Sequence, residues 1–261
     1  RAREAEAAFF DGDYTKAVAE VSKAIFLHDN DPRFYALRAD ALAELGDLNS
    51  AILNLSKALS LSEGVEAVRI KLAHTADAMG FAYLRDRMFE HALHRFSIAI
   101  EQDELNPLYW AHRALALCGL ERFDEAVEDV DHAIAIDATD ADLFVLRAKI
   151  RWKLGQESPG NADMRRAHAL RPHHPEVRAF ERSLWGKAER QYATAAAALL
   201  QGSLDTALKH LNQALSFSPN DMKALVLRAA VFRQAGRFDQ ALRDLDEASA
   251  LYRNLQGPSS P

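Results

Sequence analysis

Residues 121–127 read Glu-Arg-Phe-Asp-Glu-Ala-Val, and similar segments recur along the whole chain. They are GDYTKAV (12–18), GDLNSAI (46–52), RMFEHAL (87–93), GSLDTAL (202–208), GRFDQAL (236–242) and the weaker GQESPGN (155–161). The sixth residue of each is alanine, or Gly160 in the weaker segment, and these residues follow at intervals of 34, 41, 34, 34, 47 and 34. A fixed period of this length is typical of repeat architectures. The 261 residues therefore form seven units of 34 with insertions of 7 and 13 residues, where the first unit lacks three residues and six residues follow the last unit.

Each unit has the pattern of two helices joined by a short turn. The first helix carries a small residue at repeat position 8, such as Ala114, and the second carries small residues at positions 20 and 27, such as Ala126 and Ala133. Larger apolar residues, such as Val127 and Val130, stand beside them. Small residues let two helix backbones approach closely, while larger ones fill the space between them. The pattern therefore predicts an all-α chain.

This pattern resembles the tetratricopeptide repeat, and the resemblance extends over nearly the entire chain. The family prefers Trp at position 4 and Gly at position 8, whereas this chain often has Tyr35, Trp110 or Phe144 followed by Arg-Ala at positions 7 and 8. The resemblance implies a right-handed superhelical solenoid of antiparallel helix pairs, in which the first helix of each unit lines the concave side. It also implies a protein that works by binding other proteins.

Both insertions keep the apolar spacing of a helix. Val68 and Leu72 continue this spacing through the first insertion, and a similar series runs through the second. Since seven residues make about two helical turns, we expect two elongated first helices, at about 66–85 and 175–200. Gly186 is the expected position of any break in the longer one.

The second insertion divides the expected array. Residues 1–174 would hold five repeats, residues 175–255 a long helix with two repeats, and residues 256–261 a linker-like tail. In the fifth repeat, Pro159–Asn161 stands where the second helix should begin. We therefore expect a shortened or late-starting helix there. Because the chain starts at Arg1 without Met, we also expect it to be a segment of a longer protein.

Composition narrows the class of protein. The formal net charge of −6 argues against a protein that binds the phosphate backbone of nucleic acids, because such proteins need a surplus of clustered Lys and Arg. No run approaches 18 apolar residues, so no membrane insertion is expected. The single cysteine, Cys118, fits a reducing compartment. We expect an intracellular protein, cytoplasmic or associated with the cytoskeleton or a cilium.

Sequence motifs for catalysis, metals or cofactors are absent. There is no Gly-rich phosphate loop and no Gly-x-Ser-x-Gly elbow. His91 and His94 are three residues apart on a helix, but spacing suggests no third metal ligand, so a solvated helix face is the better interpretation. Cys118 has no histidine partner that spacing specifies. We therefore expect no enzyme activity, no metal, no cofactor and no small-molecule substrate.

One known use of this repeat is a clamp for the acidic C-terminal peptides of heat-shock chaperones. The resemblance implies Lys, Asn and Arg at fixed positions of three consecutive first helices. The first three units instead offer residues that cannot hold a carboxylate pair, namely Ala2, Glu6, Leu37, His74 and Ala78. The other triplets fail as well. A chaperone clamp is therefore disfavoured.

The expected groove is more apolar, with charged edges. A groove of this kind suits a partner helix or an extended segment, with aromatic side chains as anchors. We expect Trp152 to be exposed there, and we leave open whether Leu84, Leu115 and Val145 face the groove or are buried. The candidate binding residues are Asp77, Phe81, Arg85, His112, Leu115, Lys149, Trp152, Tyr192 and Arg233.

Two alternatives remain open at this stage. The chain could be a structural part of a stable assembly, cytoskeletal or ciliary, with contacts through its lateral faces and ends. It could also be a regulatory module within a longer enzyme. The last helix would present Leu242, Leu245 and Leu251 without a polar cap, so we expect further sequence or a partner to cover this face.

Overall fold

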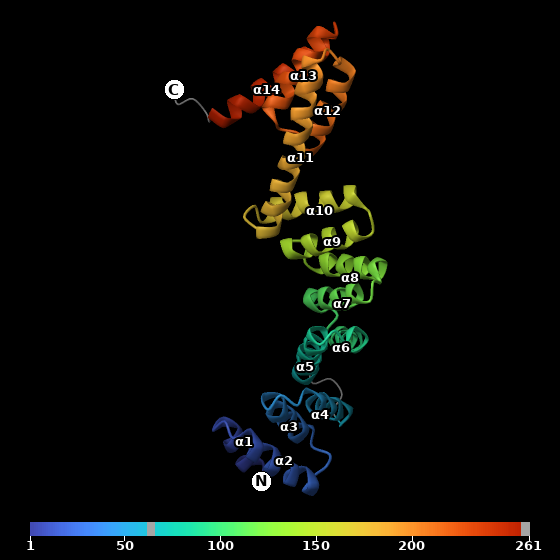
Figure 1. Ribbon diagram of the computed structural model, residues 1–261. Coiled ribbons are helices and arrows are strands. Elements are labelled where there is room, and N and C mark those ends of the chain that lie inside the picture. The colour runs from blue at the N-terminus through green and yellow to red at the C-terminus, as the bar shows by residue number, and fades with distance from the viewer. Residues whose placement is uncertain (62–65, 257–261) are drawn as a thin grey trace, which may run out of the picture. The chain divides into compact units, whose positions relative to one another are not determined.

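The computed structural model describes residues 1–61 and 66–256, and this part of the chain contains fourteen α-helices and no strand. Consecutive helices pair in chain order, as Figure 1 shows. The helices are α1 (Ala2–Phe10), α2 (Tyr14–Leu27), α3 (Pro32–Glu44), α4 (Leu48–Leu61), α5 (Glu66–Arg85), α6 (Phe89–Gln102), α7 (Pro107–Gly119), α8 (Phe123–Ile136), α9 (Ala141–Lys153), α10 (Glu157–Leu170), α11 (Pro175–Leu200), α12 (Leu204–Phe217), α13 (Met222–Gln234) and α14 (Phe238–Gln256). The all-α fold of paired helices predicted from the sequence is confirmed.

Local sequence explains where the paired helices begin and turn. Asn106 caps α7 by accepting a hydrogen bond from the Leu108 amide, and Pro107 occupies the first turn, where no amide donor is needed. Between the two helices of every repeat, one residue has positive φ. Glycine holds this place in five repeats, while Arg87 and Glu121 hold it in the third and fourth, each with φ of 59°.

The small residues at position 20 lie at the contact between the two helices of a repeat. Ala51, Ala92 and Ala126 are completely buried. Large side chains such as Phe96 and Tyr109 fill the adjoining space. Each pair of helices therefore shares an apolar interface. Successive pairs within residues 1–171, and the two pairs within residues 172–256, also pack on one another.

The chain divides into two compact units, Arg1–Arg171 and Pro172–Pro261. The boundary predicted from the sequence, between residues 174 and 175, lies three residues further along. Gln256, expected in the tail, is the last residue of α14. Residues 257–261 of the expected tail lie outside the described part of the chain.

Both expected elongated helices are present. α5 runs from Glu66 to Arg85 and α11 from Pro175 to Leu200, so the insertions extend first helices at their N-terminal ends. The expected break at Gly186 is wrong, because α11 is continuous through this residue. A Cβ atom at Gly186 would meet nothing within 4 Å, so packing does not require glycine there.

The expectation of a shortened second helix in the fifth repeat is also wrong. α10 has 14 residues, the same length as α8. Pro159 lies in its first turn, where a missing amide donor leaves no intrahelical bond unmade. Gly160 is buried beneath the Trp152 ring, and an added Cβ would lie 2.5 Å from Trp152 Nε1. The glycine thus makes room for a large neighbour.

An arginine at repeat position 7 joins neighbouring repeats. Arg113 donates from Nε and Nη2 to the two carboxylate oxygens of Asp129, at 2.9 and 2.7 Å. Its Nη1 donates to the Ser97 hydroxyl at 3.3 Å. Asp129 belongs to the second helix of the same repeat, and Ser97 to that of the preceding repeat. Arg113 therefore connects three helices.

The same arrangement recurs in four repeats. Each arginine contacts one residue 16 positions before it and one 16 positions after it: Arg38 with Ser22 and Asn54, Arg113 with Ser97 and Asp129, Arg147 with Asp131 and Asp163, and Arg228 with Asn212 and Asp244. We call this series the arginine ladder. Two of these arginines, Arg113 and Arg147, lie on α7 and α9.

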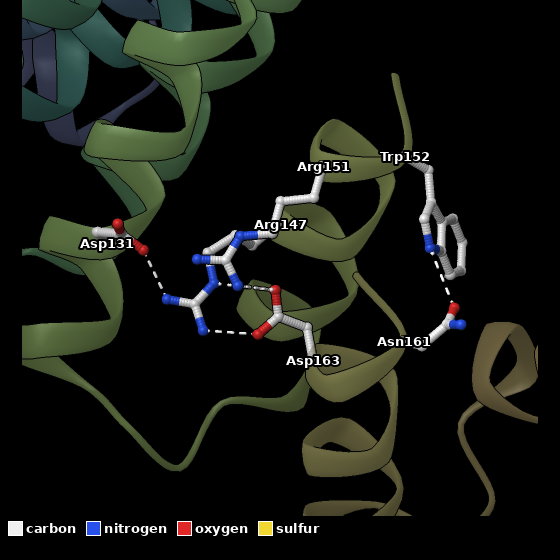
Figure 2. Close-up of polar contacts among 6 residues, drawn as sticks. All are labelled: Asp131, Arg147, Arg151, Trp152, Asn161 and Asp163. Carbon is white, nitrogen blue, oxygen red and sulfur yellow. Dashed lines mark hydrogen bonds and ion pairs between the residues drawn. The ribbon is translucent and has the colours of Figure 1, made fainter. Parts of the chain in front are cut away.

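At Arg147 the arginine ladder includes a second cation, Arg151. Arg147 donates hydrogen bonds from Nε and Nη2 to the two carboxylate oxygens of Asp163, and Arg151 Nη1 lies 2.8 Å from Asp163 Oδ2 (Figure 2). Asp163 is buried, so its charge needs these partners. In the same view, Trp152 Nε1 donates to Asn161 Oδ1 at 3.2 Å. The start of α10 is therefore held by two sets of side-chain contacts from α9.

Candidate partner-binding groove

First helices of neighbouring repeats lie side by side at several places in the first unit. α1 touches α3, α5 touches α7, and α7 touches α9. These helices correspond to those predicted to line the concave side. Helices α5, α7 and α9 carry seven of the nine candidate binding residues.

Three of the candidates meet between α5 and α7. His112 Nδ1 lies 2.7 Å from Asp77 Oδ1, and the ring nitrogen is the donor because an ionised carboxylate can only accept. The Phe81 ring stands edge-on to the His112 ring, with 4.4 Å between ring centroids. The Phe96 ring of α6 packs against both rings. Its centroid lies 5.6 Å from that of Phe81 and 5.8 Å from that of His112. These side chains therefore hold one another in fixed positions.

Apolar surface surrounds this polar pair. Phe81 is 42% exposed, and on α7 Leu108 is 50% and Leu115 39% exposed. Leu108, His112 and Leu115 follow at intervals of four and three residues, so they share one face of α7. We call Asp77, Phe81, Leu108, His112 and Leu115 the Phe81 patch. An exposed aromatic ring beside a half-buried polar pair suits a protein partner with an apolar side chain at its centre.

The polar groups beneath the Phe81 patch are satisfied. The Tyr109 hydroxyl lies 3.1 Å from His74 Nδ1. Burial, together with the nearby negative charge of Asp77, raises the pKa of Tyr109 above its ordinary value. The phenol therefore remains neutral at physiological pH and acts as a structural hydrogen-bonding group.

Two further candidates lie at the edge of the patch. Arg85 is one turn beyond Phe81 on α5, fully accessible, with Nε 3.4 Å from Asp86 Oδ1. Lys149 lies on the exposed side of α9. Val145, left open by the sequence, is buried, whereas Leu115 is exposed. Arg85 and Lys149 therefore place exposed cationic side chains on α5 and α9.

Trp152 does not have the predicted position. Its ring is half-buried, packs on Gly160 of α10 and donates to Asn161, so it belongs to the interface between the two helices of its own repeat. The expectation that Trp152 is an exposed groove anchor is therefore wrong. The signal for this outcome was Gly160, the only glycine at position 20, which leaves space for a large ring.

Tyr192 and Arg233 lie in the second unit. Tyr192 lines a hollow of about 420 Å³ between α11 and α13. Arg233 lines an adjoining hollow of about 400 Å³ between α13 and α14. The two hollows share Val226 and Ala230. The structure thus places these two candidates on one surface of the second unit.

Other potential sites are weak. Burial raises the pKa of the Cys118 thiol, which keeps it protonated and poorly nucleophilic. Among the described residues, no group of three or more His, Cys, Asp or Glu side chains is arranged to hold a metal ion. Within the same residues, no helix is both long and apolar enough to span a membrane.

A family model described as "Tetratricopeptide repeat" matches residues 3–65 and 78–141. These matched segments span repeats whose paired helices and 34-residue period are described above. The chain belongs to the tetratricopeptide repeat family. The remaining repeats of the chain continue the same helix pairing.

Named relatives carry the same repeat. The chain is 28% identical over 232 residues to human "Tetratricopeptide repeat protein 16", an alignment that covers 89% of this chain and 27% of that protein. It is 26% identical over 245 residues to the mouse protein of the same name, covering 94% of this chain and 32% of that protein. The chain therefore spans about a quarter to a third of the length of these tetratricopeptide-repeat relatives.

Solved structures of tetratricopeptide-repeat proteins are less similar to this chain in sequence than these relatives are. YrrB, titled "a TPR protein with an unusual peptide-binding site", is 18% identical with a TM-score of 0.44, and the match covers 78% of this chain and 95% of that chain. MamA from Desulfovibrio magneticus RS-1 is 15% identical with a TM-score of 0.46, covering 66% of this chain and 93% of that chain.

Two features of this tetratricopeptide-repeat array were not predicted from the sequence. Leu108, at position 2 of its repeat, is the most exposed apolar side chain of the Phe81 patch and was not among the predicted binding residues. The arginine ladder was visible only as an Arg-Ala pair. Its signal was the constant interval of 16 residues between Arg and a polar partner, as for Arg113 and Asp129.

Proposed function

We propose that this chain is a non-catalytic scaffold that binds a partner protein through the Phe81 patch on the face of the first helices. The partner would contribute a helix or an extended segment with at least one large apolar side chain. The observation that carries the proposal is the exposed Phe81 ring, held edge-on by His112 and flanked by Leu108 and Leu115. A rigid aromatic anchor binds with little further loss of side-chain entropy.

The patch has both elements that a selective site needs. Phe81 and the two leucines supply apolar area, and the Asp77–His112 hydrogen bond supplies a fixed polar edge. Arg85 adds an accessible cation one helical turn away. Apolar contacts would provide most of the affinity, whereas the polar groups would determine which partners are accepted.

A clamp for chaperone C-terminal peptides is not part of this proposal. The positions that would have to hold a carboxylate pair in the first three repeats carry no lysine or arginine; they are Ala2, Glu6, Leu37, His74 and Ala78. His74 is already engaged with the Tyr109 hydroxyl. A partner anchored by apolar side chains fits these repeats better. We further propose an intracellular location, as the composition suggests.

A photo-crosslinking experiment tests the proposal directly. A photoreactive phenylalanine analogue replaces Leu115 in one protein and Leu53 in a matched control; Leu53 is an exposed leucine on the second helix α4. Both proteins are irradiated in a native cell extract, and crosslinked proteins are identified by mass spectrometry. We expect partners captured at position 115 and absent at position 53.

The Phe81→Asp variant provides a second test in the same photo-crosslinking experiment. Phe81 is partly exposed, so the charge should leave the helix pair folded, and circular dichroism checks this. We expect the position-115 crosslinks to fall about thirtyfold or more in this background, because truncation of a central aromatic anchor costs roughly 2 kcal/mol or more. Equal capture at both positions, or capture that Phe81→Asp leaves unchanged, would refute the groove assignment.

A structural role in a stable assembly is the second candidate. It is favoured by Phe10 and Phe26, which are almost fully exposed at the ends of α1 and α2. Aromatic side chains are enriched at protein interfaces. Under this alternative, photoreactive groups at these two positions would capture the partner instead of those at Leu115.

A further inference from the structure

The loop between α12 and α13 contains a serine that is followed directly by proline. Residues 218–221 read Ser-Pro-Asn-Asp. Pro219 and Asn220 are exposed and Ser218 is partly exposed. Within the part of the chain that the structure describes, the Ser218 hydroxyl forms no hydrogen bond. The hydroxyl is therefore available for reaction at the surface of the second unit.

The backbone of Ser218 is extended, with φ of −134° and ψ of 83°. The following proline favours this conformation, because its ring clashes with a helical residue before it. A protein kinase needs the hydroxyl in line with the γ-phosphorus of ATP, deep in its own cleft. An extended loop can enter such a cleft, whereas a residue held in a helix must first unwind.

A second Ser-Pro pair of the chain differs in this respect. Ser158 and Pro159 lie in the first turn of α10, where the Gly160 amide donates to the Gln156 carbonyl at 3.1 Å. Ser158 is fully accessible, but its backbone is helical. It is therefore a control within the same chain for accessibility without an extended backbone. The third pair, Ser260 with Pro261, lies outside the described residues.

Other repeats show that the position of Ser218 accommodates an anion. Asp103, Asp137 and Ser218 are each the first residue after a second helix, with φ between −149° and −131° and ψ between 83° and 95°. Asp137 Oδ1 accepts from the Thr139 hydroxyl at 2.7 Å and from the Thr139 amide at 2.8 Å, and these hydrogen bonds lower the pKa of Asp137. Asn220 stands at the position of Thr139, so its amide can donate to a phosphate oxygen on Ser218 in the same way.

Two cations lie close to this loop. Lys187 Nζ of α11 is 5.7 Å from the centroid of the Phe217 ring, the residue before Ser218. Lys223 is exposed in the first turn of α13. Neither lysine forms an ion pair with a described residue. Asp221 is acidic, but it already accepts two backbone amides of α13. The surroundings therefore favour a phosphate, which has a charge of about −1.5 to −2 at pH 7.

We propose that Ser218 is a phosphorylation site for a proline-directed protein kinase. Ser218 Oγ attacks the γ-phosphorus of ATP held by the kinase, so that a new O–P bond forms and the bond to the β–γ bridging oxygen breaks. ADP leaves, and the hydroxyl proton passes to the catalytic base of the kinase. The phosphate adds negative charge five residues from Lys223, which lines the hollow between α11 and α13. The site is independent of the Phe81 patch.

Phosphorylation of the purified chain tests the proposal. The full 261-residue chain carries Ser260→Ala, which removes the Ser-Pro pair of the tail. It is incubated with ATP and a mitogen-activated protein kinase, and mass spectrometry identifies the modified residues. We expect close to one phosphate per chain, on Ser218. Phosphorylation of Ser158 should be at least about tenfold slower, since the first turn of α10 must open first.

Variants distinguish the role of the hydroxyl from that of the proline. Ser218→Ala should abolish the modification, and Ser158→Ala is the matched control and should react normally. Pro219→Ala keeps the hydroxyl and changes only an exposed residue, so the chain should fold, as circular dichroism would verify. We expect this variant to react about tenfold more slowly, because the kinase loses the residue that it selects.

Three results would overturn the proposal: an unmodified Ser218 while the kinase acts on a standard Ser-Pro peptide, equal rates at Ser158 and Ser218, or a Pro219→Ala variant that reacts at the normal rate. The phosphorylated chain should also keep its helical circular dichroism spectrum, since Asp103 and Asp137 occupy the same repeat position. A loss of helix on phosphorylation would show that this loop does not accept an anion.

Discussion

Replacing glycine with a larger residue is expected to have opposite effects on stability at two positions of this chain. Gly160 is buried against the Trp152 ring, and the neighbouring Ala148 carbonyl lies 3.1 Å from where a Cβ would be. Gly186 lies inside a long helix, with open space in the same direction. The change in stability when a methyl group is added to a helix glycine therefore depends on the helix packed against it and not on helix propensity alone.

We predict that Gly160→Ala lowers the free energy of unfolding by about 1–3 kcal/mol, since the Trp152 ring must move and lose its hydrogen bond to Asn161. Gly186→Ala is the matched control and should stabilise the chain by about 0.5–1 kcal/mol, because alanine favours helix. Chemical denaturation monitored by circular dichroism measures both. A stabilising Gly160→Ala would show that the ring does not fill this space.

At the scale of the helix pair, the arginine ladder supplies the polar part of the packing. Asp129, Asp163 and Asp244 are buried acids on second helices, and each is paired with an arginine from the first helix of its repeat. An ion pair of this kind adds little net stability compared with a well-packed apolar pair. Removing one member, however, leaves a buried charge unpaired.

The ladder predicts unequal effects of the same substitution. Arg113→Ala should destabilise the chain by roughly 3–5 kcal/mol, because Asp129 loses both charge-assisted hydrogen bonds. Arg147→Ala should cost less, since Arg151 still pairs with Asp163. Urea denaturation of the two variants gives the comparison.

A double variant at the Arg113–Asp129 pair distinguishes the destabilisation caused by an unpaired charge from that caused by lost packing. Arg113→Met with Asp129→Leu removes both charges and keeps most of the volume, so it should recover most of the stability lost in Arg113→Ala. If Arg113→Ala and Arg147→Ala prove equally destabilising, Arg151 does not compensate. If the double variant is no better than the single one, the loss comes from packing and not from the unpaired charge.

The whole molecule consists of two compact units that meet between Arg171 and Pro172 along the chain. In repeat proteins, stability is close to a sum of local terms and interfaces between neighbours. We propose that the two units respond independently to core damage, in line with the division suggested by the second insertion.

Hydrogen exchange measured by mass spectrometry tests this independence. Leu211 is fully buried in the second unit, and Leu211→Ala should cost about 2–5 kcal/mol. We expect faster exchange in residues 172–256 and unchanged exchange in residues 1–171. Phe96→Ala, in the core of the first unit, should have the reverse pattern. Faster exchange throughout the chain in both variants would contradict independent units.

The sequence by itself determined the features that depend on local periodicity. The 34-residue interval, the small residues at fixed positions and the uninterrupted apolar spacing predicted the paired helices and both elongated ones, α5 and α11. These are short-range properties, because one helix turn and one helix pair are encoded within about 34 neighbouring residues. Family membership followed from the same pattern.

Only the tertiary structure decided which side chains are available for binding. Asp77 and His112 are 35 residues apart, and their contact requires two first helices to stack in register. Trp152 was expected in the groove but turns to its own repeat, because Gly160 leaves space for it there. Burial depends on the neighbour that packs against a residue, and periodicity within one helix does not specify that neighbour.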